Sequence, residues 1–328
     1  TSCLYAMPAA APYFSKASIE SGPGVRMLTR EMASQTTSWL LKELDIAPKD
    51  WRKLLSVPAA ELLRIQSKIP PEPPSRFKNK PGGPPDTGPF GFGPVVDGDN
   101  LPTHPFDPVA PAISSDKPLM VGWNEDEYTF FAWQRRDTSA IGLDFAGLEA
   151  KIKAQYGSDT EQIIETYRRV MPNASPTDIF VAIASITMMG LGSVEIAEKK
   201  AAQNCAPVYL YHFGYKSEQK IPETDYALGT PHAMDIPLKF SNESLTERLE
   251  YLSGSRPERF TASHHMAELW TSFARTGSPA AVGLPEWPAY NLNERPSMRI
   301  DTNCEVINNR FGEELAMWRS IGMLPVLK

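Results

Sequence analysis

The segment KPLMVGWNEDE (residues 117–127) decides the predicted fold of this chain. Its first half is a compact apolar run, which is typical of a buried strand in a parallel sheet. Its second half places three carboxylates, those of Glu125, Asp126 and Glu127, immediately after the strand. Open α/β sheets bind their ligands outside the carboxyl ends of their strands. The segment therefore predicts a parallel sheet with an acidic candidate site at its edge, although from these residues alone a solvated polar loop is the better explanation of the three acids.

The rest of the chain alternates between apolar runs and stretches with helical periodicity. Besides the run at 117–123, strands are predicted at 17–20, 207–213 and 298–301. Helices are predicted at 28–44, 48–69, 143–156, 159–170, 177–203, 244–252, 258–276 and 311–321. Strands that alternate with helices and long insertions predict a layered α/β fold.

One segment, 70–94, breaks this pattern sharply. It contains nine prolines and five glycines, so it is predicted to be a long irregular loop. Its phenylalanines, Phe77, Phe90 and Phe92, are unusual for a solvated linker. They indicate that the loop packs onto the domain or lines a site.

Composition excludes several classes of protein. With 33 Lys+Arg against 39 Asp+Glu the net charge is −6, which argues against nucleic acid as a partner. The longest apolar stretch, 179–194, is shorter than the roughly 20 residues of a membrane span, so it predicts a buried helix in a soluble chain. Three scattered cysteines form no disulfide framework, and no HExxH pattern supports a metal site.

A candidate general base lies in the segment GTPHAMDIP (residues 229–237). His232 stands there between turn-forming residues and an apolar run, in the loop that follows the 207–213 strand. A loop histidine bonded to the backbone is the alternative interpretation. The chain contains no G-x-S-x-G, the pattern that presents a nucleophilic serine on a strand-to-helix turn.

Five segments in order resemble the type-B carboxylesterases, the cholinesterase and para-nitrobenzyl esterase group. They are AAAPYFSKASIESGPG (9–24), FGPVVDGDNLPTHP (92–105), PLMVGWNEDEYTFF (118–131), GTPHAMDIPLKF (229–240) and WTSFARTGSPAAVGLPEWPAYN (270–291). The resemblance covers essentially the whole chain and implies the C-terminal part of one α/β-hydrolase domain, residues 1–328. The elbow serine is then expected roughly half a dozen residues before Thr1, in an N-terminal portion of the same enzyme.

The resemblance also implies roles for individual residues. Glu127 matches the acid of a Ser-Glu-His triad, His232 matches its base, and Ser21 matches a buried hydroxyl that supports the acid. The remaining matches are aromatic positions that line the substrate gorge, with the last a weaker extension: Phe90, Phe130, Phe131 and Trp133. The segment 70–94 would be a gorge loop.

The chain departs from the family pattern at two positions. Tyr128 replaces a common glycine and is expected to reshape the gorge mouth, and Asp235 replaces a frequent glutamate. The implied substrate is a small ester with an apolar acyl or alcohol group, and no cofactor or metal is expected. A non-catalytic, cholinesterase-like adhesion or binding protein and a structural remnant without function are the alternatives. The esterase interpretation is favoured because Glu127 and His232 are both present.

Overall fold

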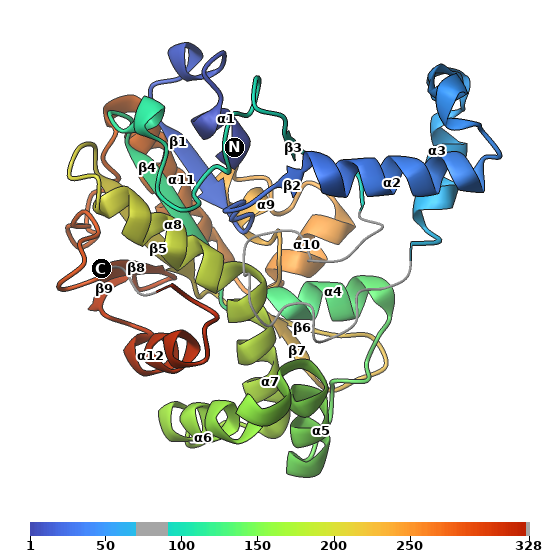
Figure 1. The fold of residues 1–328 in the computed structure, drawn as a ribbon. Helices are drawn as coiled ribbons and strands as arrows, with labels where there is room; N and C mark the ends of the chain where they lie inside the picture. The colour runs from blue at the N-terminus through green and yellow to red at the C-terminus, as the bar shows by residue number, and fades with distance from the viewer. Residues whose placement is uncertain (70–90, 326–328) are drawn as a thin grey trace.

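The computed structural model describes residues 1–69 and 91–325. At its centre lies a five-stranded sheet of order β1-β4-β5-β8-β9 (Figure 1). The strands are β1 (Ala17–Glu20), β4 (Leu119–Asn124), β5 (Val208–Phe213), β8 (Pro296–Ile300) and β9 (Glu305–Asn308). The first four run parallel, and β9 is antiparallel to β8. The predicted α/β fold with a mostly parallel sheet is therefore confirmed.

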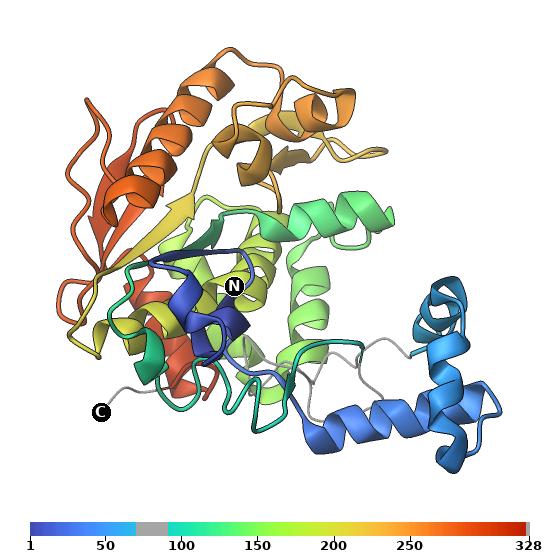
Figure 2. The same ribbon diagram turned by 90° about the horizontal axis from the view of Figure 1, so that it is seen from above.

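Strands β4 and β5 are buried along their whole length because helices cover both faces of the sheet. Neighbouring residues of each strand pack into two separate hydrophobic cores, one on each face of the sheet. Val121 and Leu210 belong to one core, and Met120 and Tyr211 belong to the other. Helix α8 (Leu191–Ala201) covers the first face and α11 (Glu258–Thr276) the second (Figures 1 and 2). This two-sided burial explains why both strands read as continuous apolar runs.

Smaller elements complete the described chain. The other helices are α1 (Ser2–Ala6), α2 (Arg30–Glu43), α3 (Ala59–Gln66), α4 (Glu127–Arg135), α5 (Phe145–Tyr156), α6 (Thr160–Val170), α7 (Pro176–Ser185), α9 (Asp235–Lys239), α10 (Glu247–Ser253) and α12 (Gly312–Ser320). Two further pairs of strands are β2 (Leu28–Thr29) with β3 (Val95–Val96), and β6 (Ser217–Lys220) with β7 (Ala227–Gly229). Helices α2 and α3 project away from the sheet in both views (Figures 1 and 2).

The structure differs from the sequence prediction in several elements. The single helix predicted over 48–69 is a 3₁₀ segment, Pro48–Ser56, followed by α3. Pro58 divides the two, because a residue that precedes proline is driven out of the helical region, and Val57 has ψ 128°. Helix α4, the β6–β7 pair and β9 were not predicted. Most of the predicted loop 70–94 lies outside the described residues.

The predicted buried helix over 177–203 is present as one continuous helical segment, Pro176–Ala201, with a π-helical turn in its middle. It is the one helix of the described chain long and apolar enough to cross a membrane. However, 72% of its apolar window is buried within the domain, and it packs against β4 and β5. It is therefore accounted for as a core helix.

Candidate active site

The side chain of Glu127 is completely buried where β4 ends and α4 begins. Its Oε1 accepts a hydrogen bond from the backbone N–H of Asn124 at 2.7 Å and another from the hydroxyl of Ser21. Buried carboxylates are stable only when hydrogen bonds replace their lost water. These two donors satisfy one oxygen and leave Oε2 for a third partner.

That third partner is His232, whose Nδ1 lies 2.6 Å from Oε2 of Glu127. The histidine follows β7, and its side chain remains 27% exposed. No described residue forms a hydrogen bond with its Nε2. Burial lowers the pKa of His232, but the hydrogen bond and negative charge of Glu127, with Asp235 behind it, outweigh burial and raise that pKa above its usual 6.5. The imidazole is thus oriented through Nδ1 and exposes Nε2 as a proton acceptor.

Two contacts from the β4 turn hold the loop that carries His232. The amide of Asn124 donates to the carbonyl oxygen of Pro231 at 2.8 Å, and the Asp126 carboxylate accepts from the N–H of Thr230 at 2.9 Å. One turn therefore positions both Glu127 and His232.

The backbone beside the acid–base pair is also unusual. Ser21 has φ +46° and Ala233 has φ +66°, in the left-handed region that non-glycine residues rarely adopt. Such conformations persist only where the surrounding structure determines them strongly, and they concentrate at functional sites. Ser21 donates to Glu127 and Ala233 directly follows His232, so both residues lie against the pair.

Aromatic rings from α4 enclose the imidazole. Phe131 stacks on His232 with ring centroids 5.2 Å apart, and Phe130 meets it nearly edge-on at 5.6 Å. Trp133 continues this wall at 5.7 Å from Phe130 and stacks on Tyr251 of α10 at 5.4 Å. The structure thus brings together the predicted gorge residues of α4, whereas Phe90 lies outside the described residues.

The side chain of Tyr128 lies against α7. Its ring packs edge-on against Phe180 of α7 at 5.2 Å, and its backbone N–H donates to Ser185 at 3.1 Å. The tyrosine side chain, which stands where the family commonly has glycine, is therefore accommodated by the core beside α7. Sequence spacing alone does not reveal that it points toward α7.

Two polar residues lie behind the pair, of which the sequence analysis missed Asn124 and gave no role to Asp235. Asn124 is fully buried, and its amide donates to Asp235 Oδ1 at 3.1 Å. Asp235 is itself 2% exposed, and Lys239 lies 3.5 Å from its other oxygen. Burial, followed by the nearby charge of Glu127, raises the pKa of Asp235 to about 6. A polar residue that ends a wholly apolar strand, as Asn124 does, was the available signal.

Asp235→Asn is expected to flatten the dependence of stability on pH. Because the folded-state pKa of about 6 exceeds the ordinary 3.8, Asp235 contributes stability that is present below pH 3.8 and is lost as the pH rises through 6. The asparagine cannot titrate. Urea unfolding at several values between about pH 4 and pH 7 should therefore show a smaller loss in the variant than in the parent. The exposed Asp225→Asn is the control, and an unchanged slope in Asp235→Asn would contradict this account.

The other candidates are engaged elsewhere. Glu125 pairs with Arg299 at 3.1 Å, and Asp126 pairs with Lys216 at 3.0 Å. His212 is fully enclosed within β5, and burial holds its pKa well below the usual value. Within residues 1–69 and 91–325 no three His, Cys, Asp or Glu side chains are grouped as metal ligands.

Comparison with known proteins assigns this arrangement to a family. A model of the carboxylesterase family matches residues 1–318. The chain belongs to the carboxylesterase family. Its sheet is accordingly that of an α/β-hydrolase, as the resemblance implied.

Individual carboxylesterases are similar over different shares of their length. The para-nitrobenzyl esterase of Bacillus subtilis (strain 168) is 28% identical over 312 residues, which are 95% of this chain and 58% of that protein. The phenmedipham hydrolase of Pseudarthrobacter oxydans is 28% identical over 63% of this chain and 39% of its own length. The crystal structure of the Geobacillus stearothermophilus carboxylesterase at pH 6.2 is 30% identical, with a TM-score of 0.74 over 97% of this chain and 61% of that one. The chain thus spans about three fifths or less of each of these relatives.

Proposed function

We propose that this chain supplies the acid and the base of a serine carboxylesterase, with His232 as general base and Glu127 as its orienting acid. The observation that carries the proposal is the 2.6 Å contact between Nδ1 of His232 and the buried carboxylate of Glu127. This contact fixes the neutral imidazole with its proton on Nδ1, so that Nε2 carries the free lone pair. A histidine held in this way can activate an alcohol that is unreactive at its own pKa.

The proposed reaction proceeds in two halves. Nε2 of His232 takes the proton of a serine hydroxyl as the serine oxygen attacks the ester carbonyl, and Glu127 stabilises the resulting imidazolium. The tetrahedral intermediate collapses, the C–O bond to the alcohol breaks, and Nε2 returns the proton to the departing alkoxide. Water then repeats these steps on the acyl-serine and releases the carboxylic acid.

The serine is proposed to come from an N-terminal portion of the same enzyme, because the printed sequence contains no G-x-S-x-G. Strand β1 supports this arrangement, since it ends the order of the described sheet and pairs there only with β4. The strand delivers Ser21 to Glu127 at its carboxyl end. A further parallel strand along its free edge would place its own carboxyl end beside His232.

The proposed substrate is a small ester with an apolar acyl or alcohol group. Phe130 and Phe131 contact the imidazole directly, and Trp133 and Tyr251 extend the same wall outward. Aromatic faces favour apolar ligands and lower the local dielectric around the reacting atoms. Residues 70–94 remain proposed as part of the gorge.

The test is covalent trapping of the nucleophile. A fluorophosphonate probe should label the chain stoichiometrically only when an N-terminal portion with an elbow serine is present, and peptide mapping should find the label on that serine. Labelling of a serine within residues 1–328 would contradict the proposed origin of the nucleophile. Absence of labelling in the combined protein would favour the non-catalytic alternative.

A further inference from the structure

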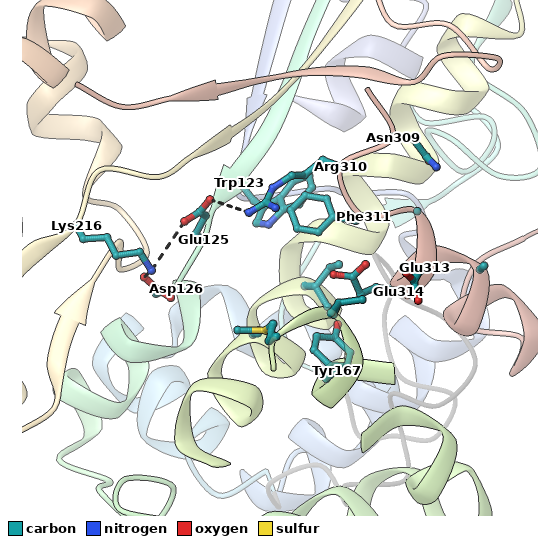
Figure 3. Close-up of a pocket in the computed structure, with 16 residues that line it drawn as sticks. Trp123, Glu125, Asp126, Tyr167, Lys216, Asn309, Arg310, Phe311, Glu313 and Glu314 are labelled. Carbon is teal, nitrogen blue, oxygen red and sulfur yellow. Dashed lines mark hydrogen bonds and ion pairs between the residues drawn. The ribbon is translucent and has the colours of Figure 1, made fainter. Parts of the chain in front are cut away.

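A cavity of about 650 Å³ opens beside the acidic turn, and neither His232 nor the rings around it line this cavity. Its walls come from the end of β4, the end of α6, the α7 segment and the connection from β9 to α12 (Figure 3). This volume falls within the range of about 300–1,000 Å³ that is typical of small-molecule sites.

One end of the cavity is polar, but its charges pair with one another. Oε1 of Glu125 lies 3.1 Å from Nε of Arg299. It also lies 3.8 Å from Nη2 of Arg310, while Lys216 contacts Asp126 at 3.0 Å (Figure 3). A ligand that approached this end would have to break these ion pairs. The polar end therefore shapes the cavity and offers no free charge.

The other end holds the Glu314 carboxylate, which forms no ion pair within the described residues. Glu314, in the first turn of α12, is half-buried, and no other residue of the described ranges donates a hydrogen bond to its carboxylate or forms an ion pair with it. Its side chain reaches into the cavity above the ring of Tyr167 (Figure 3). Burial raises the pKa of Glu314 and outweighs its own backbone N–H and the charge of Arg310, which both lower that pKa.

Part of the cavity wall is apolar. The apolar lining residues include Val170, Met171, Ala182 and Ile186. The Tyr167 hydroxyl accepts a hydrogen bond from Nε1 of Trp318 at 3.2 Å and is thereby held in place.

Charge decides which ligand this cavity favours. Four acids and two bases line it: Glu125, Asp126, Glu313 and Glu314 against Lys216 and Arg310. A neutral apolar ligand would displace water and leave the Glu314 carboxylate unpaired, which is costly. Glu125, Asp126 and Glu313 are already in ion pairs with Arg299, Lys216 and Arg169. Glu314 is therefore the lining carboxylate left to pair with a cation, whose apolar part would cover the wall.

We propose that this cavity binds a small organic monocation, an alkyl- or arylammonium ion whose head group pairs with Glu314 and whose apolar part contacts Met171 and Ile186. This site is separate from the proposed ester site and does not depend on it. Its chemistry is that of recognition, since no described nucleophile or proton-transfer pair faces the ammonium position.

Titration calorimetry with three probes of one chain length tests the proposal on protein that melts cooperatively. Hexylammonium should bind saturably and at least tenfold more tightly than 1-hexanol or hexanoate. Glu314→Gln should weaken hexylammonium binding at least tenfold. Glu313→Gln is the matched control and should change it less than twofold, because the neighbouring Glu313 already pairs with Arg169 at 2.7 Å.

A second variant tests the apolar wall while Glu314 remains intact. Ala182→Phe fills part of the cavity and should also weaken binding at least tenfold, with cooperative melting retained. The proposal would be overturned if hexylammonium bound the parent and Glu314→Gln equally, or if its binding were unchanged in a folded Ala182→Phe. Tighter binding of hexanoate than of hexylammonium, or no saturation below about 10 mM hexylammonium, would also overturn it.

Discussion

Replacing His232 by alanine is expected to lower kcat for ester hydrolysis roughly 10³-fold or more in the enzyme that carries the elbow serine. Without an imidazole at this position nothing accepts the serine proton, and the alkoxide of the departing alcohol receives none in return. KM should change far less, because the rings of Phe130 and Phe131 remain in place. Steady-state hydrolysis of a p-nitrophenyl ester measures both quantities.

The pH profile gives an independent readout of the same residue. Because only neutral His232 can accept a proton, kcat/KM of the parent should fall on the acid side with a pKa above 6.5, in the raised direction that Glu127 and Asp235 impose. His264→Ala, on the exposed surface of α11, is the matched control and should leave rate and profile unchanged. A His232→Ala enzyme with more than about a tenth of parental kcat would remove this histidine from the mechanism.

Glu127→Gln is expected to reduce kcat by roughly 10³- to 10⁴-fold, because it changes the tautomer of the base. The glutamine amide can present its NH₂ group to Nδ1 of His232, which then accepts a hydrogen bond and leaves the ring proton on Nε2. A protonated Nε2 cannot take the serine proton, and the imidazolium also loses its counter-charge. The same steady-state assay measures this loss.

Two comparisons separate this effect from simple damage to the fold. Glu125→Gln is the better neighbouring control, because Glu125 pairs with Arg299 and contacts neither Glu127 nor His232 through its side chain. The kcat of the Glu125→Gln enzyme should stay within about threefold of the parental value. Asp126 is less suitable, since it holds the N–H of Thr230 in the base-bearing loop. The double variant Glu127→Gln, His232→Ala should be no worse than His232→Ala alone, and fully additive losses in free energy would show that the two residues do not act as a unit.

The features predicted correctly from sequence depend on local patterns. The apolar runs of β4 and β5 and the periodicity of α11 are properties of contiguous residues, so they were visible without tertiary information. The proximity of Glu127 and His232 was expected from a family resemblance, because they stand 105 positions apart.

The features that were missed depend on contacts between distant segments. Asp126 precedes α4 in the N-cap position, but its carboxylate bonds the N–H of Thr230 rather than the helix, so α4 lacks the usual side-chain cap that marks a helix start. Strands β6 and β7 pair across only a few residues. The burial of Asp235 depends on how α9 packs against α11, which no local pattern encodes.

The wide separation of Ser21, Glu127 and His232 along the chain has a consequence for how this protein folds. The hydroxyl contact joins residues 106 positions apart and the imidazole contact joins residues 105 apart, so both close long loops. Closing long loops costs entropy before any contact compensates it, and chains rich in such contacts fold slowly. The contacts among Ser21, Glu127 and His232 are complete only after β1, β4 and the loop after β7 have docked. A probe of the His232 environment, such as its imidazole NMR signal, would therefore report one of the last steps of folding.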